Sequence, residues 1–253
     1  MLNYVEYGKE NKYDDDIFFQ KYSQMSRSQQ GLAGAGEWET LRKLLPDFKD
    51  KRVLDLGCGY GWHCIYAMEH GASSVVGVDI SHKMLEVAKE KTHFPQVEYK
   101  CCAIEDVEFP EESFDVILSS LAFHYVADYE ILVKKIYRIL KSGGKLVFTV
   151  EHPVFTAYGT QGWHYNEKGE ILHFPVDNYY YEGKRTAVFL GEKVTKYHRT
   201  LTTYLNTLLS NGFIINHIVE PQPPEYMMDI PGMQDEMRRP MMLIVSANKK
   251  VDR

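Results

Sequence analysis

Glycines and carboxylates near the start of the chain have the types and spacing of a nucleoside-binding site. The glycines stand in the run Asp55-Leu-Gly57-Cys-Gly59-Tyr-Gly61, and an acidic residue, Asp79, follows eighteen residues after the last of them. Glycines lack a Cβ atom, so a turn that contains them lets the backbone approach a ligand closely. A carboxylate such as Asp79 can accept hydrogen bonds from both hydroxyls of a ribose. The pattern predicts a site for a ligand that contains a ribose.

The elements around these residues predict a doubly wound α/β fold. Apolar runs at 52–56 and 74–78 are typical of strands, and a helical pattern at 62–70 lies between them. A second helix is expected from Ser81, because serine can cap its first turn. Further strands are expected at 97–102, 114–119 and 145–150, and a helix at 128–140 is expected to stop at Gly143-Gly144. Such alternation predicts a parallel sheet that binds ligands at the carboxyl ends of its strands.

Beyond residue 151 the pattern changes. An aromatic-rich stretch continues to about Arg199 and is followed by a helix at 201–210 and strands at 213–219 and 241–247. We interpret the aromatic stretch as an insertion after the fifth strand, and the late elements as the end of the same sheet.

The residues from Lys51 to Glu151 resemble the class I (Rossmann-like) S-adenosylmethionine (SAM)-dependent methyltransferases, with a fainter likeness beyond them. Trp62 stands where the dinucleotide fingerprint G-x-G-x-x-G requires glycine, which disfavours the alternative of a dinucleotide-dependent oxidoreductase. The resemblance implies a mostly parallel seven-stranded sheet with a C-terminal antiparallel strand, SAM as cofactor and S-adenosylhomocysteine as product. A non-catalytic SAM-binding protein is the other alternative.

The resemblance also implies which residues hold the cofactor. Asp55 would order the loop near the amino group of the methionine moiety. Ala103 stands where an acid often meets adenine, so the backbone of Ile104 and Glu105 is expected there instead. Residues 1–50 are expected to form lid helices, in which an aromatic ring could face the sulfonium and Arg27 the carboxylate. The expected cofactor-binding residues are Tyr22, Arg27, Asp55, Gly57, Cys58, Gly59, Gly61, Asp79, Ile80, Ile104, Glu105, Ser119 and Leu121.

Methyl transfer from SAM is an in-line displacement, so a base is needed only if the acceptor must lose a proton. The candidates for that base are His124, Glu151 and His152, each of which could instead have a structural role. The methyltransferase domain is expected to span residues 51–253, with the insertion at 152–199 as a substrate cover. The expected substrate-binding residues are Tyr125, Trp163, Tyr180, His198 and Arg199. Arg238 and Arg239 are expected to be a solvated surface pair.

Composition limits the class of methyl acceptor, the partners and the location that we expect for the protein. A net charge of −6 disfavours nucleic acid and anionic membranes as partners, and 119–123 lacks the Asn/Asp-Pro-Pro-aromatic sequence typical of enzymes that methylate base amino groups. A small-molecule acceptor is therefore expected. The four cysteines form no C-x-x-C pair, so we expect free thiols and no metal site. No apolar run approaches the length of a membrane span, and we expect the protein to stay in the cytosol.

Overall fold

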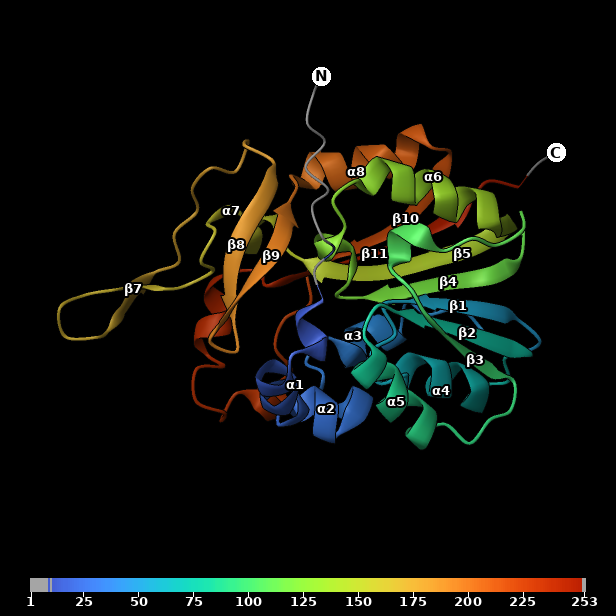
Figure 1. Ribbon diagram of the computed structural model, residues 1–253. Helices are drawn as coiled ribbons and strands as arrows, with labels where there is room; N and C mark the ends of the chain where they lie inside the picture. Colours follow the sequence, from blue (N-terminus) through green and yellow to red (C-terminus); the bar gives the residue numbers. More distant parts are fainter. Residues whose placement is uncertain (1–8, 10, 252–253) are drawn as a thin grey trace, which may run out of the picture.

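A computed structural model describes residue 9 and residues 11–251, and within them seven strands form one twisted sheet (Figure 1). The strand order is β10-β11-β5-β4-β1-β2-β3. Strands β1 to β5 run parallel to one another, whereas β11 is antiparallel to both β5 and β10. The bounds are β1 (Arg52–Leu56), β2 (Ser74–Asp79), β3 (Val97–Cys101), β4 (Phe114–Ser120), β5 (Leu140–Glu151), β10 (Phe213–Val219) and β11 (Met242–Lys249). The predicted fold class is confirmed.

Helices cover both faces of this sheet, with α6 and α8 together on one side and α4 and α5 on the other (Figure 1). Successive side chains of a strand point to opposite faces, so Leu54 and Leu56 pack with α6 and α8 while Val53 packs with α4. Two apolar cores result, one on each face. The bounds are α4 (Trp62–Glu69), α5 (His82–Lys91), α6 (Tyr129–Ile139) and α8 (Leu201–Ser210).

Short helices precede the sheet where lid helices were expected. They are η1 (Lys12–Asp14), α1 (Asp16–Ser23), α2 (Ser26–Gln29), η2 (Gly31–Gly34) and α3 (Trp38–Arg42), and residues 1–8 and 10 of the expected lid lie outside the described residues. The ring of Phe18 in α1 is fully buried against Ala187 and Val194 of the insertion. Trp38 and Leu41 of α3 belong to the core on the α4 side. The amino-terminal segment therefore bridges the sheet and the insertion.

The segment after β5 consists of α7 (Pro153–Ala157) and two hairpins. The strands β6 (His164–Tyr165) and β7 (Ile171–His173) form one hairpin, which projects away from the sheet (Figure 1), and β8 (Gly183–Phe189) pairs antiparallel with β9 (Glu192–His198) in the other. Later in the chain, two 3-10 turns, η5 (Glu225–Met227) and η6 (Asp235–Arg238), lie in the link between β10 and β11. The four cysteines carry free thiols, and every helix in the described part of the chain is too short or too polar to cross a bilayer.

One expected boundary was wrong. Strand β5 begins at Leu140 rather than at Lys145, because Leu140 is already extended, fully buried and paired with Phe114 of β4. Helix α6 ends at Ile139, within one residue of its expected end, but the two glycines do not stop it. The register then shifts between this pair and the pair of Val116 with Lys145. The glycines lie in that irregular stretch, where Gly143 has a φ of +73°. They let β5 bulge instead of stopping the helix.

Candidate functional site

A cavity of about 520 Å³ lies at the carboxyl ends of the parallel strands. Residues that directly follow or end β1, β2, β3, β4 and β5 all contribute to its lining: Gly57 and Gly59, Asp79 and Ile80, Ala103 to Glu105, Ser120 to Ala122, and Glu151. Its volume is within the range of small-molecule sites. The position is the one that a doubly wound sheet predicts for a ligand.

The glycine turn after β1 exposes backbone to this cavity. The N–H groups of Gly57 and Cys58 donate to the Val78 carbonyl at 2.8 and 2.9 Å, which fixes the turn on β2. Gly57 and Gly59 have φ values of +78° and +53°, a region that glycine adopts without strain. A Cβ atom on Gly57 would collide with Ala122, whereas the corresponding space at Gly59 is open. A ligand can therefore approach the backbone at Gly59.

The carboxylate of Asp79 joins the ends of β1 and β2. Its Oδ2 accepts a hydrogen bond from Gly59 N–H at 2.8 Å, and its Oδ1 accepts one from Ser81 N–H at 2.9 Å. Burial raises the pKa of this carboxyl, although the hydrogen bonds from Ser81 and Gly59 act to lower it. Each carboxylate oxygen has a second lone pair, so two further hydroxyl groups can be bound. That capacity fits a ribose diol.

Asp55 lies beneath the glycine turn and outside the cavity. Its side chain is buried, Oδ2 accepts from the Cys64 thiol at 3.5 Å, and Oδ1 has no hydrogen-bond partner among the residues that the structure describes. Burial raises the pKa of Asp55 to about 7. Three other expected cofactor residues, Cys58, Gly61 and Ser119, also lie outside the cavity, and Ser119 instead donates to the Leu56 carbonyl at 2.7 Å. The other expected cofactor residues line it.

Residues of the amino-terminal segment form one wall of the cavity. Arg27 Nη2 donates to both carboxylate oxygens of Glu37, at 2.8 and 2.9 Å, and both side chains line the cavity. Tyr13 packs edge-on against Tyr22, with ring centroids 5.2 Å apart, and the hydroxyls of Tyr13 and Tyr125 lie 3.3 Å from each other. Three aromatic rings and one ion pair therefore surround this end of the site.

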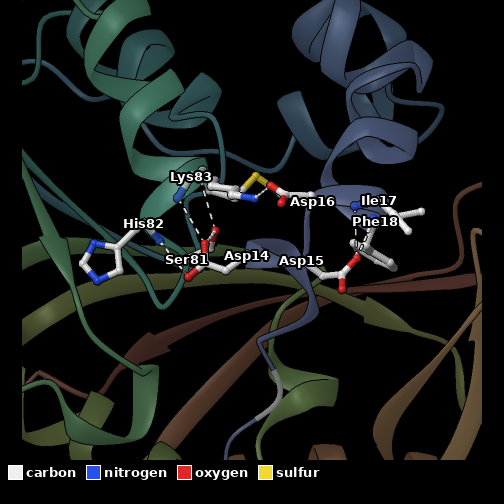
Figure 2. A network of polar contacts seen from close by, with 9 residues as sticks. Asp14, Asp15, Asp16, Ile17, Phe18, Ser81, His82 and Lys83 are labelled. Atoms are coloured by element: carbon white, nitrogen blue, oxygen red, sulfur yellow. Dashed lines mark hydrogen bonds and ion pairs between the residues drawn. The ribbon is translucent and has the colours of Figure 1, made fainter.

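Asp14 connects the amino-terminal segment to the start of α5 (Figure 2). Its carboxylate accepts hydrogen bonds from Ser81 Oγ at 2.6 Å and from Lys83 N–H at 3.1 Å, at the first turn of α5. The neighbouring Asp15 points the other way and caps α1, accepting from the N–H groups of Ile17 and Phe18. Asp14 thus connects two elements, whereas Asp15 stabilises a single helix.

His124 and Glu151 lie together in the cavity lining beside Tyr125, whose ring centroid is 4.6 Å from that of His124. His124 Nδ1 accepts from the Glu151 N–H at 3.3 Å, and burial lowers the pKa of the imidazole to about 4. The Glu151 carboxylate lies 2.5 Å from Lys196 Nζ and accepts from Gln161 Nε2 at 2.6 Å. Burial acts to raise the pKa of Glu151, but His124, Lys196 and these hydrogen bonds outweigh burial and lower it. This part of the lining holds a neutral histidine and a buried ion pair.

Comparison with known proteins decides the family. Residues 54–148 match the methyltransferase domain family. The fold superposes on that of a Mesorhizobium loti SAM-dependent methyltransferase with a TM-score of 0.80 and 41% identity, covering 86% of this chain and all of that one. This chain belongs to the SAM-dependent methyltransferases. A Listeria monocytogenes structure assigned to the same enzymes has a TM-score of 0.83 and 57% identity, covering 87% of this methyltransferase and 99% of that chain. An uncharacterised Haemophilus influenzae protein is 35% identical over 250 residues, which are 94% of the methyltransferase and 96% of that protein.

The cofactor of the methyltransferase is therefore SAM. Of the three residues considered as a general base, His124 and Glu151 line the cavity. His152 lies outside it. Its Nδ1 accepts from Val154 N–H at 3.0 Å as the N-cap of α7, and its Nε2 lies 2.9 Å from Glu220 Oε1. Nδ1 therefore holds the backbone of α7, and the ring lies beside the link after β10 rather than in the cavity.

Of the expected substrate-binding residues, the structure brings Tyr125 to the cavity and places the other four outside it. Tyr180 is 88% exposed. His198 is buried between Thr156 Oγ1, at 2.7 Å, and the Tyr179 carbonyl, at 2.9 Å. Trp163 packs against Phe174, with ring centroids 5.3 Å apart. These three side chains shape the insertion rather than the lining of the site.

Arg199, the fourth of them, lies behind the loop that carries His124. Its guanidinium donates to the carbonyl oxygens of Val126 and of Ala127, the latter at 2.9 Å, and lies 3.5 Å from the Phe123 carbonyl. The short turn η4 (Phe123–Tyr125) follows β4 and has little regular structure of its own. Arg199 therefore positions residues of the site without lining it.

The link between β10 and β11 supplies a wall that sequence reasoning missed. Its residues that line the cavity are Pro221, Gln222, Pro223, Met227, Ile230, Met233, Glu236, Arg239 and Met241. The apolar residues of the link recur with neither the period of a strand nor that of a helix, so no element was expected there. The signal that could have indicated a site is the high content of methionine, a residue that fills irregular apolar sites. The expectation that Arg239 is solvated was wrong, because its side chain is only 6% exposed. Arg238 is more exposed and pairs with Asp235.

Proposed function

We propose that the enzyme methylates a small organic molecule, bound between the end of β5 and the wall formed by residues 221–242. The observation that supports this most is the continuity of the cavity, which extends from Gly59 and Asp79 to His124 and Glu151. A volume of about 520 Å³ is within the range of cavities that bind small molecules. The net charge of −6 is also unfavourable for a nucleic-acid acceptor.

The proposed cofactor contacts follow from the lining. Asp79 would accept the ribose hydroxyls, the open backbone at Gly59 would contact the sugar and methionine part, and Ile80 and Ile104 would enclose the adenine. Tyr13 and Tyr22 would attract the sulfonium through their ring faces. Asp55 lies outside the cavity, so it would act on the cofactor through the glycine turn rather than by direct contact.

When bound, SAM supplies a methyl group that is activated by a positively charged sulfur. The residues of the chain then have to align the acceptor and exclude water. His124 suits alignment, because with Nδ1 accepting from Glu151 N–H the neutral ring carries its proton on Nε2, which can donate to the acceptor. Glu151 is held as a carboxylate by Lys196. Neither residue has the pKa near 7 that favours a general base, so we propose an acceptor that reacts without one.

Tritium transfer tests the acceptor class. The full chain is incubated with SAM labelled on its methyl group and a cell extract separated into small molecules, RNA, DNA and protein. Label that appears in the small-molecule fraction, and that is lost in Asp79→Asn, supports the proposal. Label confined to RNA, DNA or protein would overturn it.

A further inference from the structure

The guanidinium of Arg239 is buried in the wall of the cavity among three aromatic rings. It lies 4.4 Å from the ring centre of Phe155, 4.6 Å from that of Phe174 and 4.8 Å from that of Trp163. Its side chain is 6% exposed, and the residue lines the cavity. The aromatic rings fix the plane of a permanently charged group beside the acceptor space.

The hydrogen-bonding capacity of this guanidinium is only partly used. Nη2 donates to Glu236 Oε1 at 3.0 Å, and Nη1 lies 2.8 Å from Oε2 of the same carboxylate. Nε and Nη1 are both buried and make no hydrogen bond within the described ranges, although Nη1 lies close to the carboxylate. A buried charged donor without a partner has lost its hydrogen bonds to water without replacing them, so such a group indicates a missing acceptor.

Lys196 is another cation that lines the cavity, but its hydrogen-bonding capacity is used by the protein. Its ammonium contacts the Glu151 carboxylate at 2.5 Å and Gln161 Oε1 at 3.1 Å, so it is neutralised and hydrogen-bonded by the protein itself. Glu236 lies in the short turn η6, three residues before Arg239, and its side chain is 21% exposed. A ligand carboxylate could displace it into solvent.

We propose that the methyl acceptor carries an oxyanion, a carboxylate or a phosphate, which binds the unused edge of Arg239. The apolar part of the acceptor then packs on Met227, Ile230 and Met233 of the same wall. An oxyanion fits because it only accepts hydrogen bonds and matches the planar fork of a guanidinium. Glu236 occupies part of that fork until the ligand arrives. This inference rests on the proposed function and specifies in addition that the small-molecule acceptor is negatively charged.

The test uses 4-fluorobenzoate and 4-fluorobenzamide, which have the same shape and differ in charge. Fluorine NMR measures their dissociation constants with the full chain saturated with S-adenosylhomocysteine. The wild-type protein should bind the benzoate at least about tenfold more tightly than the benzamide, a difference of about 1.4 kcal/mol. In a parallel titration, 4-fluorophenyl phosphate binding more tightly than the benzoate identifies a phosphate, and the reverse order identifies a carboxylate.

Two substitutions should act in opposite directions. Arg239→Gln should abolish the preference for the anion, whereas Glu236→Gln should strengthen anion binding several-fold, because the internal competitor loses its charge. Arg238→Gln is the matched control, since Arg238 lies outside the cavity. Calorimetry with S-adenosylhomocysteine shows that each variant keeps a folded cofactor site.

Equal binding of benzoate and benzamide, no saturable benzoate binding at tens of millimolar, or a weaker anion affinity in Glu236→Gln would each overturn the inference. If the ion pair of Arg239 and Glu236 only stabilises the wall, both Arg239→Gln and Glu236→Gln should weaken anion binding. Transfer of tritium to small molecules would be unaffected by such a failure, so the inference and the proposed function are tested separately.

Discussion

The carboxylate of Asp79 holds the backbone amide of Gly59 at 2.8 Å, so the residue that ends β2 also sets the conformation of the turn after β1. Its other oxygen accepts from Ser81 at the start of α5. One side chain therefore fixes the geometry of three elements around the cavity. A substitution there should alter cofactor binding through the turn as well as through any direct contact.

Asp79→Asn should weaken binding of S-adenosylhomocysteine by roughly ten- to a hundredfold, because a hydrogen bond to a charged group contributes about 1.5–3 kcal/mol. The amide must also turn an NH₂ group toward one of two N–H donors. Isothermal titration calorimetry measures the change. Asp115→Asn is the control, since Asp115 likewise accepts from a backbone N–H, that of Arg52 at 2.9 Å, but lies outside the cavity. Equal affinities in both variants would contradict the role of Asp79.

Asp14→Ala should accelerate release of S-adenosylhomocysteine by about tenfold, because its bonds to Ser81 and Lys83 hold the amino-terminal wall on α5. Stopped-flow displacement measures the dissociation rate. Asp15→Ala removes a helix cap at a similar cost in stability but leaves that connection intact. If both variants release the ligand at the same rate, the connection has no role in retention.

Asp55→Asn should change the pH dependence of stability. The folded pKa of Asp55, about 7, is above the value of about 3.9 for an unfolded chain, so between these values the folded state binds the extra proton. The contribution of Asp55 to the free energy of unfolding therefore falls as pH rises from 4 to 7, by at most about 1.4 kcal/mol per pKa unit, and is then constant. Urea unfolding without cofactor at pH 5 and pH 8 should show the variant gaining stability relative to the wild type at pH 8. Asp115→Asn should show no such gain, because the pKa of Asp115 is lowered.

Arg199→Gln should reduce methyl transfer far more than cofactor affinity. The loss of hydrogen bonds to the carbonyls of Val126 and Ala127 frees the turn that carries His124, at a cost of about 2–4 kcal/mol in stability. Urea unfolding and calorimetry give the two quantities. Arg185→Gln is a suitable control, since Arg185 also binds backbone carbonyls, those of Ala157 and Asn178, but within the insertion. Transfer that falls equally in both variants would point to general loosening.

The sheet and the cofactor end could be predicted because their signals are local. Alternating apolar residues such as Val53 and Leu54 define a two-faced strand, and the glycine turn with Asp79 marks the end of the sheet that binds ligands. The start of β5 could not be predicted, because pairing between Leu140 and β4 begins the strand before the two glycines that were expected to separate it from the helix. Tertiary pairing overrode a local stop signal.

The part of the cavity around His124 and Glu151 could be predicted only in part. His124, Tyr125 and Glu151 lie at or shortly after the carboxyl ends of β4 and β5, whereas Arg239 is brought to the cavity by a link without periodicity. Burial of an arginine among Phe155, Phe174 and Trp163 depends on contacts across more than sixty residues. No pattern within a short window carries that information. Tyr180 shows the converse, since an aromatic residue in the insertion is almost fully solvent-exposed.

Gly36 of the amino-terminal segment and Met227 of the acceptor wall form a seam across the cavity, since a Cβ atom at position 36 would lie 3.7 Å from the Met227 sulfur and 3.8 Å from Pro224. An amino-terminal segment that lifts to exchange S-adenosylhomocysteine for SAM would also part this seam and expose the acceptor space to solvent. A bound acceptor would then be free to leave after each turnover. An acceptor that receives more than one methyl group would therefore be methylated distributively, with the singly methylated product accumulating before the doubly methylated one.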